Sequence, residues 1–249
     1  MIILKSDREL DMMHESGKIA YSAMCKAEQA VRPGVTTKQL DKLIEDEIIR
    51  FGAVPSFKGY GGFPGSACIS VNDEVVHGIP SKRTLKEGDI VSIDLGALYH
   101  GYHSDMARTF AVGEITPEHR QLIKVTEECF YKALFFMVPG NRIGDISKAV
   151  EEHAESFGYG VVRDLVGHGI GRELHEDPSI PNFTGRTMGP KLRAGMALAV
   201  EPMINLGTWQ VRFSKTDGWT VTTADGKYSA HYENTVGIRD GEPVILTMP

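Results

Sequence analysis

Two carboxylates occur in or beside an apolar run that is typical of a buried β-strand, in the stretch 91–110, "VSIDLGALYHGYHSDMARTF". Asp94 lies within the run, and Asp105 follows eleven positions later, beyond a turn that contains Gly101. Burial of an ionised carboxylate without a partner costs several kcal/mol or more. We therefore ask which positive group stabilises these two side chains.

The stretch predicts a β-hairpin, for which two registers are open. A two-residue loop at Tyr99–His100 places Asp94 directly opposite Asp105, whereas a loop at His100–Gly101 places Asp94 opposite Ala107 and leaves Asp105 diagonal to it. In both registers the two carboxylates lie on the same face of the sheet. Two like charges in such positions destabilise the pair unless something positive lies between them.

Protein side chains of the hairpin do not supply this charge, because the first basic residue, Arg108, has the opposite parity to Asp105. A bound cation is the simplest compensation, and further donors occur later in the chain. His168 lies between two glycines in "GHGIGRELHEDP", which permit tight backbone conformations and leave room for a ligand to approach the ring. Glu201 in "LAVEPM" and Glu233 in "AHYENTVGI" also lie in apolar or β-branched runs.

Four carboxylates are more than one cation can use, whereas two divalent ions about 3.5–4 Å apart can use all of them. An oxygen-dominated site with a single imidazole favours manganese, iron or cobalt over a structural zinc. Each residue alone also has a plainer explanation, as a hydrogen-bonded acid, a core histidine or a salt-bridge partner. Their recurrence inside apolar strands favours the dimetal site.

A weak internal repeat places two of these acids at matching points of the chain. Residues 26–52 align with residues 132–158 at an offset of 106 without gaps, and eight of the 27 pairs are identical, against about two expected from ordinary residue usage. At an offset of 107, "LKEGDIVSIDLG" aligns with "LRAGMALAVEPM", which sets Asp94 over Glu201. A duplicated α/β half explains these matches better than chance resemblance does.

The elements that must position the site predict an α+β fold. Hydrophobic periodicity and helix-stop residues predict helices at 7–31, 36–51, 117–137 and 143–157. Hairpins are expected around Asn72–Asp73 and in the stretch 91–110, and two or three antiparallel strands with Asp-Gly turns follow residue 219. We expect one domain, 1–249, with the helices covering a curved, mostly antiparallel sheet. Its two pseudo-symmetric halves would be about 1–115 and 116–249.

Composition and charge narrow the class of protein. The chain has 249 residues, of which 41% are hydrophobic and 24% charged, as in ordinary globular proteins. Its formal charge of −6 gives no general attraction to nucleic acid or to anionic membranes. Three scattered cysteines suit a reducing compartment, and no stretch has the apolar length of a signal peptide or membrane span. We therefore expect a cytoplasmic protein, and nothing demands more than a monomer.

The motifs resemble those of the methionine aminopeptidases of the bacterial type (type I), in the pita-bread dimetal peptidase family. The shared motifs are "DLGALYHGYHSDMART", "GHGIGRELHEDP", "EPMI" and "YENT", with "HGIP" upstream and "DGWT" downstream, so that the resemblance covers essentially the whole chain. It implies a pita-bread fold, in which two α/β halves form a single catalytic domain around two divalent ions, with zinc as a further possible metal. It also implies removal of the initiator methionine from nascent polypeptides with a small second residue, with transient contact to the ribosome.

The resemblance further implies a role for each matching residue. The metal ligands would be Asp94, Asp105, His168, Glu201 and Glu233. Asp105 and Glu233 would bridge both ions, and Glu201 would also accept a proton from the attacking water as general base. His77 would lie near the scissile nitrogen, and His175 would polarise the scissile carbonyl. The substrate pocket, which suits a thioether, would be lined by Tyr60, Phe63, Cys68, His77, His175 and Trp219, with Leu174 beside His175.

Two positions of the pocket depart from the pattern of the family. Phe63 stands where many relatives have tyrosine, and Leu174 where some have phenylalanine, which changes the pocket rim and not the reaction. Cys68 is expected to line the pocket and not to act as a nucleophile. The other histidines are expected at the surface or in turns: His14, His100, His103, His119, His153 and His231. Of these, His103 and His231 come closest to the ligand strands.

Three other functions are disfavoured. Proline-specific aminopeptidases of the same fold usually carry a further N-terminal domain, for which 249 residues leave no space. A binding module that had lost its metals, or a metal-free hydrolase of the creatinase kind, would lack ligands that are all present in this sequence.

Overall fold

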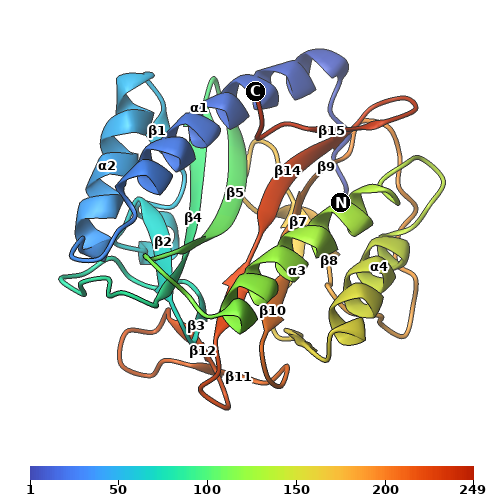
Figure 1. Cartoon of the computed structure of the whole chain (residues 1–249). Coiled ribbons are helices and arrows are strands. Elements are labelled where there is room, and N and C mark those ends of the chain that lie inside the picture. The colour runs from blue at the N-terminus through green and yellow to red at the C-terminus, as the bar shows by residue number, and fades with distance from the viewer.

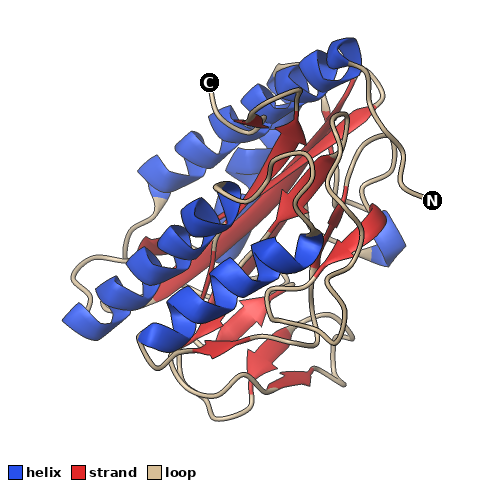
Figure 2. Cartoon of the chain, turned by 90° about the vertical axis from the view of Figure 1, so that its right-hand side faces the viewer, coloured by secondary structure: helices blue, strands red, loops and turns tan.

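Four α-helices lie on one side of a large antiparallel sheet in the computed structural model, which describes residues 1–249 (Figure 1). The view turned by 90° shows the helices gathered along that side (Figure 2). Each helix falls within three residues of its expected bounds: α1 (Asp7–Ala30), α2 (Thr37–Arg50), α3 (Pro117–Leu134) and α4 (Ile143–Ser156). The predicted α+β class is therefore confirmed. None of the helices combines the length and the apolar character needed to cross a lipid bilayer.

The large sheet has nine strands, and every neighbouring pair in it is antiparallel. Its main path runs through β1 (Val54–Pro55), β4 (Ile90–Tyr99), β5 (Tyr102–Ala111), β14 (Glu233–Ile238), β9 (Ala197–Val200), β7 (Gly167–Gly169) and β8 (Glu176–Ile180). Two further strands pair at its sides, β2 (Ala67–Val71) with β4 and β15 (Pro243–Ile245) with β14. The strands that carry the candidate ligands thus form the middle of this sheet.

Two smaller sheets and a short 3-10 helix, Tyr60–Gly62, complete the architecture. One small sheet contains β13 (Ser229–His231), β10 (Met203–Asn205) and β6 (Gly160–Val161). The other contains β11 (Val211–Phe213), β12 (Val221–Thr223) and β3 (Glu74–Val76). The turn expected at Asn72–Asp73 joins β2 to β3, and the N–H of Ile69 donates to the carbonyl of Gly78 across it at 2.8 Å. The expected ladder between the two strands does not form: β3 pairs with β12, which lies 145 or more residues away, and β2 pairs with β4. Local turn residues cannot reveal such a distant partner.

Each helix pair packs on its own part of the sheet through a separate apolar core. Helices α1 and α2 cover β2 and β4 through buried residues that include Leu40, Ile44, Ile69 and Ile93. Helices α3 and α4 cover β9 and β14 through buried residues that include Leu122, Phe130, Val150, Leu198 and Val236. Side-chain caps fix where α1, α2 and α3 begin, from the residues Ser6, Thr36 and Thr116.

The two parts of the internal repeat adopt matching local conformations. The N–H of Gly34 donates to the carbonyl of Leu85 at 2.8 Å, and the N–H of Gly140 donates to the carbonyl of Leu192 at 3.1 Å. The positions in these two bonds correspond at the offsets of 106 and 107 found in the sequence. We propose on this basis that residues 1–249 form one domain made of two related halves, about 1–115 and 116–249.

The β4–β5 hairpin adopts the second of the two open registers. Tyr99 pairs with Tyr102, so the loop is His100–Gly101, and Asp94 pairs with Ala107. Both loop residues have positive φ, 50° and 81°, which matches the left-handed conformation that such short hairpin loops require. Asp94 and Asp105 are therefore diagonal to each other on the same face of the sheet.

Candidate metal and substrate site

The register of the central strands places three of the candidate ligands in one row. Asp94 on β4 pairs with Ala107 on β5, and Ala107 pairs with Glu233 on β14. Directly paired residues of antiparallel strands point to the same face, so Asp94 and Glu233 flank the small side chain of Ala107. Glu201 follows the last residue of β9, the other neighbour of β14, and comes to lie beside Glu233.

A second row lies two residues away along β5. Asp105 pairs with Gly96 on β4, and its backbone N–H donates to the hydroxyl of Thr235 on β14 at 2.9 Å. Beyond β14, Thr235 pairs with Ala199 on β9, and Ala199 pairs with His168 on β7. Small or short side chains thus separate the carboxylate of Asp105 from the imidazole of His168, which leaves room between them.

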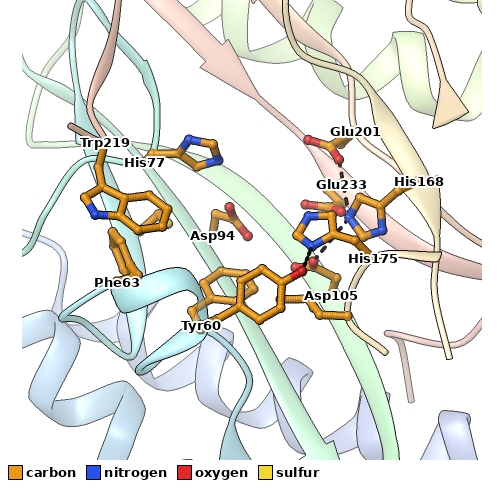
Figure 3. A pocket seen from close by; sticks show the side chains of 13 residues that line it. Tyr60, Phe63, His77, Asp94, Asp105, His168, His175, Glu201, Trp219 and Glu233 are labelled. Carbon is orange, nitrogen blue, oxygen red and sulfur yellow. Dashed lines mark hydrogen bonds and ion pairs between the residues drawn. The ribbon is translucent and has the colours of Figure 1, made fainter. Parts of the chain in front are cut away.

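The side chains of the two rows converge on one point (Figure 3). Nε2 of His168 lies 3.7 Å from Oδ2 of Asp105 and 3.7 Å from Oε1 of Glu201. Asp105, His168 and Glu233 present three potential ligand atoms within 4.8 Å of one another, and we call them the Asp105 cluster. Asp94, His231 and Glu233 form a second group within the same limit, the Asp94 cluster. Glu233 belongs to both clusters, so the two are adjacent.

The donors of these clusters fit divalent cations. Oδ1 of Asp94, Oδ1 of Asp105 and Oε1 of Glu233 are buried without a hydrogen-bond partner. The ion-pair partners of Asp105, Glu201 and Glu233 are histidines, and no lysine or arginine reaches any of the four carboxylates. Buried carboxylates with free oxygens and no cationic side chain are typical of a metal site.

Burial shifts the acid–base properties of all four carboxylates in the same direction. It raises the pKa of Asp94 to about 7. It also raises the pKa of Asp105, Glu201 and Glu233 well above the usual range, and repulsion from neighbouring carboxylates raises them further. Four acids whose ionised forms are each destabilised in this way form a site that binds either protons or cations.

The imidazole of His168 is oriented by its own backbone neighbourhood. Its Nδ1–H can donate to the carbonyl of Gly169 at 2.8 Å, which leaves the lone pair of Nε2 facing the carboxylates. The flanking glycines are required by close packing and not by an unusual backbone conformation, since neither has positive φ. A Cβ on Gly167 would lie 2.4 Å from the carbonyl oxygen of Ala199, and one on Gly169 would lie 2.1 Å from that of Asp177.

The loop that carries Leu174 and His175 is held by a buried ion pair. Nζ of Lys5 lies 2.5 Å from Oε2 of Glu176, and both side chains are about 95% buried. The other oxygen of Glu176 accepts a hydrogen bond from the backbone N–H of Arg172 at 2.9 Å. The carboxylate of Glu176 thus ties the loop at Arg172 to Lys5 in the N-terminal segment, which fixes the position of His175.

A cavity of about 150 Å³ joins the two clusters to an apolar wall. An engineered protein cavity of about this size binds benzene, so the volume suits one side chain of moderate size. Its lining contains every site residue expected from the sequence, together with Leu174 and the unpredicted Phe57: Tyr60, Phe63, Cys68, His77, Asp94, Asp105, His168, His175, Glu201, Trp219 and Glu233. Phe57 carries no sequence signal apart from being an apolar residue near Tyr60.

Aromatic residues form the side of the cavity opposite the carboxylate clusters (Figure 3). The rings of Phe63 and Trp219 meet edge to face with centroids 5.2 Å apart, and the ring of His77 lies 6.3 Å from that of Trp219. On the opposite side, the hydroxyl of Tyr60 lies 2.8 Å from Nδ1 of His175. An apolar wall therefore faces a polar, carboxylate-rich wall across one small space.

Cys68 lies on β2 directly opposite Asp94 on β4. Burial and the charge of Asp94 raise the pKa of its thiol well above the usual value, so the sulfur is a neutral, apolar part of the lining. This environment is the opposite of the electropositive one that activates a nucleophilic cysteine.

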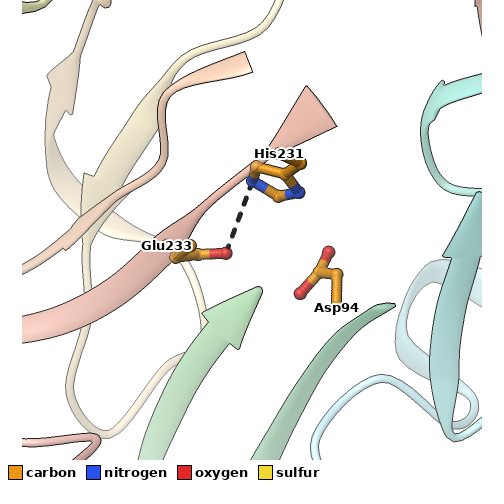
Figure 4. A group of neighbouring side chains, drawn as sticks. All are labelled: Asp94, His231 and Glu233. Atoms are coloured by element: carbon orange, nitrogen blue, oxygen red, sulfur yellow. Dashed lines mark ion pairs between the residues drawn. The ribbon is translucent and has the colours of Figure 1, made fainter. Parts of the chain in front are cut away.

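The expected surface or turn position of His231 is wrong. Its side chain is 1% exposed and points at Asp94 and Glu233 from the end of β13 (Figure 4). It lies two positions before Glu233, so strand parity was the signal that could have identified it. Three of the other histidines bind away from the clusters, His14 to the carbonyl of Met248, His103 to Ser56 and His153 to Glu128.

Comparisons with known proteins agree with this geometry. The sequence profile described as "Metallopeptidase family M24" matches residues 11–240. The chain is 57% identical over 249 residues to the methionine aminopeptidase of Clostridium acetobutylicum, which covers 100% of this chain and 99% of the relative. The crystal structure of methionine aminopeptidase from Rickettsia prowazekii superposes with a TM-score of 0.98 at 40% identity, with 100% of each chain covered.

A more distant structure shares the fold over part of its length. The prolidase of Pyrococcus furiosus superposes with a TM-score of 0.80 at 25% identity, covering 99% of this chain and 66% of the prolidase chain. About a third of that protein therefore lies outside the shared part.

Proposed function

The chain belongs to metallopeptidase family M24 and, within it, to the methionine aminopeptidases, and we propose how its residues remove the N-terminal initiator methionine from proteins. The observation that carries the proposal is the cavity in which an aromatic wall faces two carboxylate–imidazole clusters. The wall suits a thioether side chain and the clusters suit a metal-dependent hydrolysis. Release of free methionine from a Met-Ala-Ser peptide by the metal-loaded protein tests this function.

We propose that the clusters hold two divalent cations. The ligands would be Asp94, Asp105, His168, Glu201 and Glu233, and the membership of Glu233 in both clusters supports a bridging role for it. Manganese, iron or cobalt suits an oxygen-rich donor set, and zinc is a further candidate. When bound, such ions would polarise the scissile carbonyl and make a water molecule more acidic.

The aromatic wall would bind the methionine side chain. Phe63, Trp219 and Cys68 offer two aromatic rings and a neutral thiol within one cavity, and thioether sulfur contacts aromatic rings favourably. Phe57 and Tyr60 extend this apolar surface, and Tyr60 is also exposed to solvent. Because the cavity of about 150 Å³ has room for a single side chain, the second residue of the substrate must lie at its mouth, where small residues fit best.

Two histidines would act on the peptide bond. With the hydroxyl of Tyr60 donating to Nδ1 of His175, the proton of this imidazole resides on Nε2, from which it can donate to the scissile carbonyl oxygen. His77 lines the cavity from the side of Trp219 and would lie near the scissile nitrogen. Burial lowers the pKa of His77 to about 4, so its ring is neutral at physiological pH and can exchange a hydrogen bond with that nitrogen.

Glu201 would serve as the general base. Its side chain keeps 14% exposure, more than that of Asp105 or Glu233, so it is open to a water molecule in the cavity. Its two oxygens face the imidazoles of His168 and His231, which holds the carboxylate in one orientation. From this position Glu201 can accept a proton from the attacking water and pass it to the leaving nitrogen.

We also propose that the protein acts in the cytoplasm as a monomer on nascent chains, with transient contact to the ribosome. The three free cysteines support a reducing compartment. The net charge of −6 gives no broad electrostatic attraction to nucleic acid.

A further inference from the structure

The buried imidazole of His231 lacks any hydrogen-bond partner. Neither Nδ1 nor Nε2 is bonded, and the side chain is 1% exposed. A buried polar ring with both nitrogens unsatisfied loses its interactions with water without replacement, which makes such groups rare in native structures. By contrast, Nδ1 of His168 has a carbonyl partner and Nδ1 of His175 has the hydroxyl of Tyr60. Among the histidines at the clusters, His231 alone therefore has neither ring nitrogen bonded to another group of the chain.

Contacts of the His231 backbone fix where its imidazole points. The hydroxyl of Thr109 on β5 accepts a hydrogen bond from the N–H of His231 and lies 2.9 Å from its carbonyl oxygen. Ser92 on β4 supports the same hydroxyl at 2.8 Å. His231 also pairs with Met203 in the sheet of β13 and β10. These contacts bind the backbone of His231 to two sheets, so its side chain is held toward Asp94 and Glu233 (Figure 4).

The distances suit a shared cation. Nε2 of His231 lies 3.7 Å from Oε2 of Glu233 and 3.7 Å from Oε2 of Glu201. These separations are too long for hydrogen bonds. Two donors that each lie about 2.1 Å from one metal ion are roughly 3–4 Å apart, so the observed spacing is that of two ligands of one ion. Asp94 completes the set, with its ligand atom within 4.8 Å of both others.

We propose that His231 is a metal ligand, whose Nε2 binds the cation held by Asp94 and Glu233, so that each of the two cations has one imidazole. This inference rests on the proposed dimetal function and adds a donor to its ligand set. The two clusters then have the same composition, one imidazole from His168 or His231, one aspartate each, and the shared Glu233. An imidazole on both sides shifts the donor set away from manganese and toward cobalt, iron or zinc.

Cobalt-loaded protein provides a direct test, because the ring N–H protons of imidazoles bound to paramagnetic Co²⁺ are shifted far outside the ordinary range of proton NMR. The wild-type protein with two equivalents of Co²⁺ should show two such signals, and His231→Gln should show one. His168→Gln should also show one, at the position that His231→Gln removes. A positioning role for His231 through a hydrogen bond would leave a single signal in the wild type and would overturn the proposal.

Affinity and stoichiometry distinguish this failure from failure of the dimetal function. By titration calorimetry with Co²⁺, His231→Gln should bind its first ion like the wild type and its second at least about 10-fold more weakly. Unchanged binding of both ions would overturn the ligand role of His231 alone, whereas a wild-type protein that binds no ion would overturn the dimetal proposal itself. His103→Gln, which changes a histidine bonded to Ser56, is the matched control and should bind both ions normally. If His231→Gln does not fold, His231→Asp provides a second variant that keeps a donor and should retain both ions with one shifted imidazole signal.

Discussion

Asp94 and Asp105 lie diagonally across the β4–β5 hairpin, and the residue directly opposite each of them is small. Ala107 pairs with Asp94, and Gly96 pairs with Asp105. Ala107 also pairs with Glu233 on the next strand, so one methyl group separates two candidate ligands. The register thus does two things: it keeps like charges from direct pairing and it leaves space on this face for cations.

Ala107→Val should fill part of that space. Two added methyl groups between Asp94 and Glu233 should weaken cation binding at least about 10-fold, measured by equilibrium dialysis with Mn²⁺ or Co²⁺. Ala97→Val is the matched control. Ala97 on β4 is fully buried like Ala107, but its side chain points to the other face of the sheet. Both variants should lose about 1–3 kcal/mol of folding free energy through overpacking. Equal metal affinity in the two variants would contradict the assigned face.

Asp94→Asn should separate activity from folding. The amide keeps the shape of the carboxylate but loses its charge, so turnover of a methionyl peptide should fall below about 1% of the wild type. The metal-stripped variant should nevertheless be at least as stable as the metal-stripped wild type, because one of four mutually repelling carboxylates is gone. Thermal unfolding followed by circular dichroism checks this. His168→Ala should lose activity similarly, and retention of more than a few per cent in either variant would refute the site assignment.

The metal-stripped protein should lose stability as pH rises. Burial raises the pKa of Asp94 from 3.8 to about 7, so between these values the folded chain binds more protons than the unfolded chain. Stability from the protonated carboxyl is complete below the unfolded pKa and is lost as pH rises through the folded pKa. Urea unfolding should therefore give a lower free energy of unfolding at about pH 7.5 than at about pH 5.5, with a smaller difference in Asp94→Asn. A rise over this interval that Asp94→Asn does not alter would contradict the burial of the site carboxylates.

Tyr60→Phe should impair the reaction without affecting metal binding. It removes the hydroxyl that lies 2.8 Å from Nδ1 of His175 and that, in the proposed mechanism, donates to this nitrogen. A hydrogen bond of about 1–1.5 kcal/mol corresponds to a roughly 5- to 10-fold loss in kcat. Steady-state kinetics and Co²⁺ titration should show this loss with unchanged metal affinity. Tyr131→Phe, which affects a hydroxyl near Tyr232, is the control and should leave kcat unaltered.

Local sequence pattern predicted most of the fold. The four helices were identified within three residues because their caps, apolar periodicity and Gly stops are local signals. Pairing partners were harder. The two registers of the β4–β5 hairpin differed by one loop position, and the pairing of β3 with β12 depends on residues about 145 positions apart. Tertiary packing decides such pairings, and no local turn residue encodes it.

The expected site residues meet at one cavity, which Phe57 also lines, and His231 lies beside two of them. The expected residues all line one cavity, since acids inside apolar strands are an unusual and therefore informative signal. Local sequence pattern does not indicate that His231 is buried, because polar residues are mostly exposed. Its burial arises from the meeting of β13 with the large sheet, a contact between distant parts of the chain. Phe57 was missed for a similar reason, because any apolar residue is compatible with a core position.

The most direct test of the central claim uses two tripeptides and mass spectrometry. Metal-stripped protein, with and without added Mn²⁺ or Co²⁺, is incubated with Met-Ala-Ser and with Ala-Pro-Ser. We expect free methionine from the first peptide only, and only when metal is present. Cleavage of Ala-Pro-Ser alone would show a proline-specific peptidase, and cleavage of Met-Ala-Ser by the stripped protein in the presence of a chelator would contradict the metal-dependent mechanism.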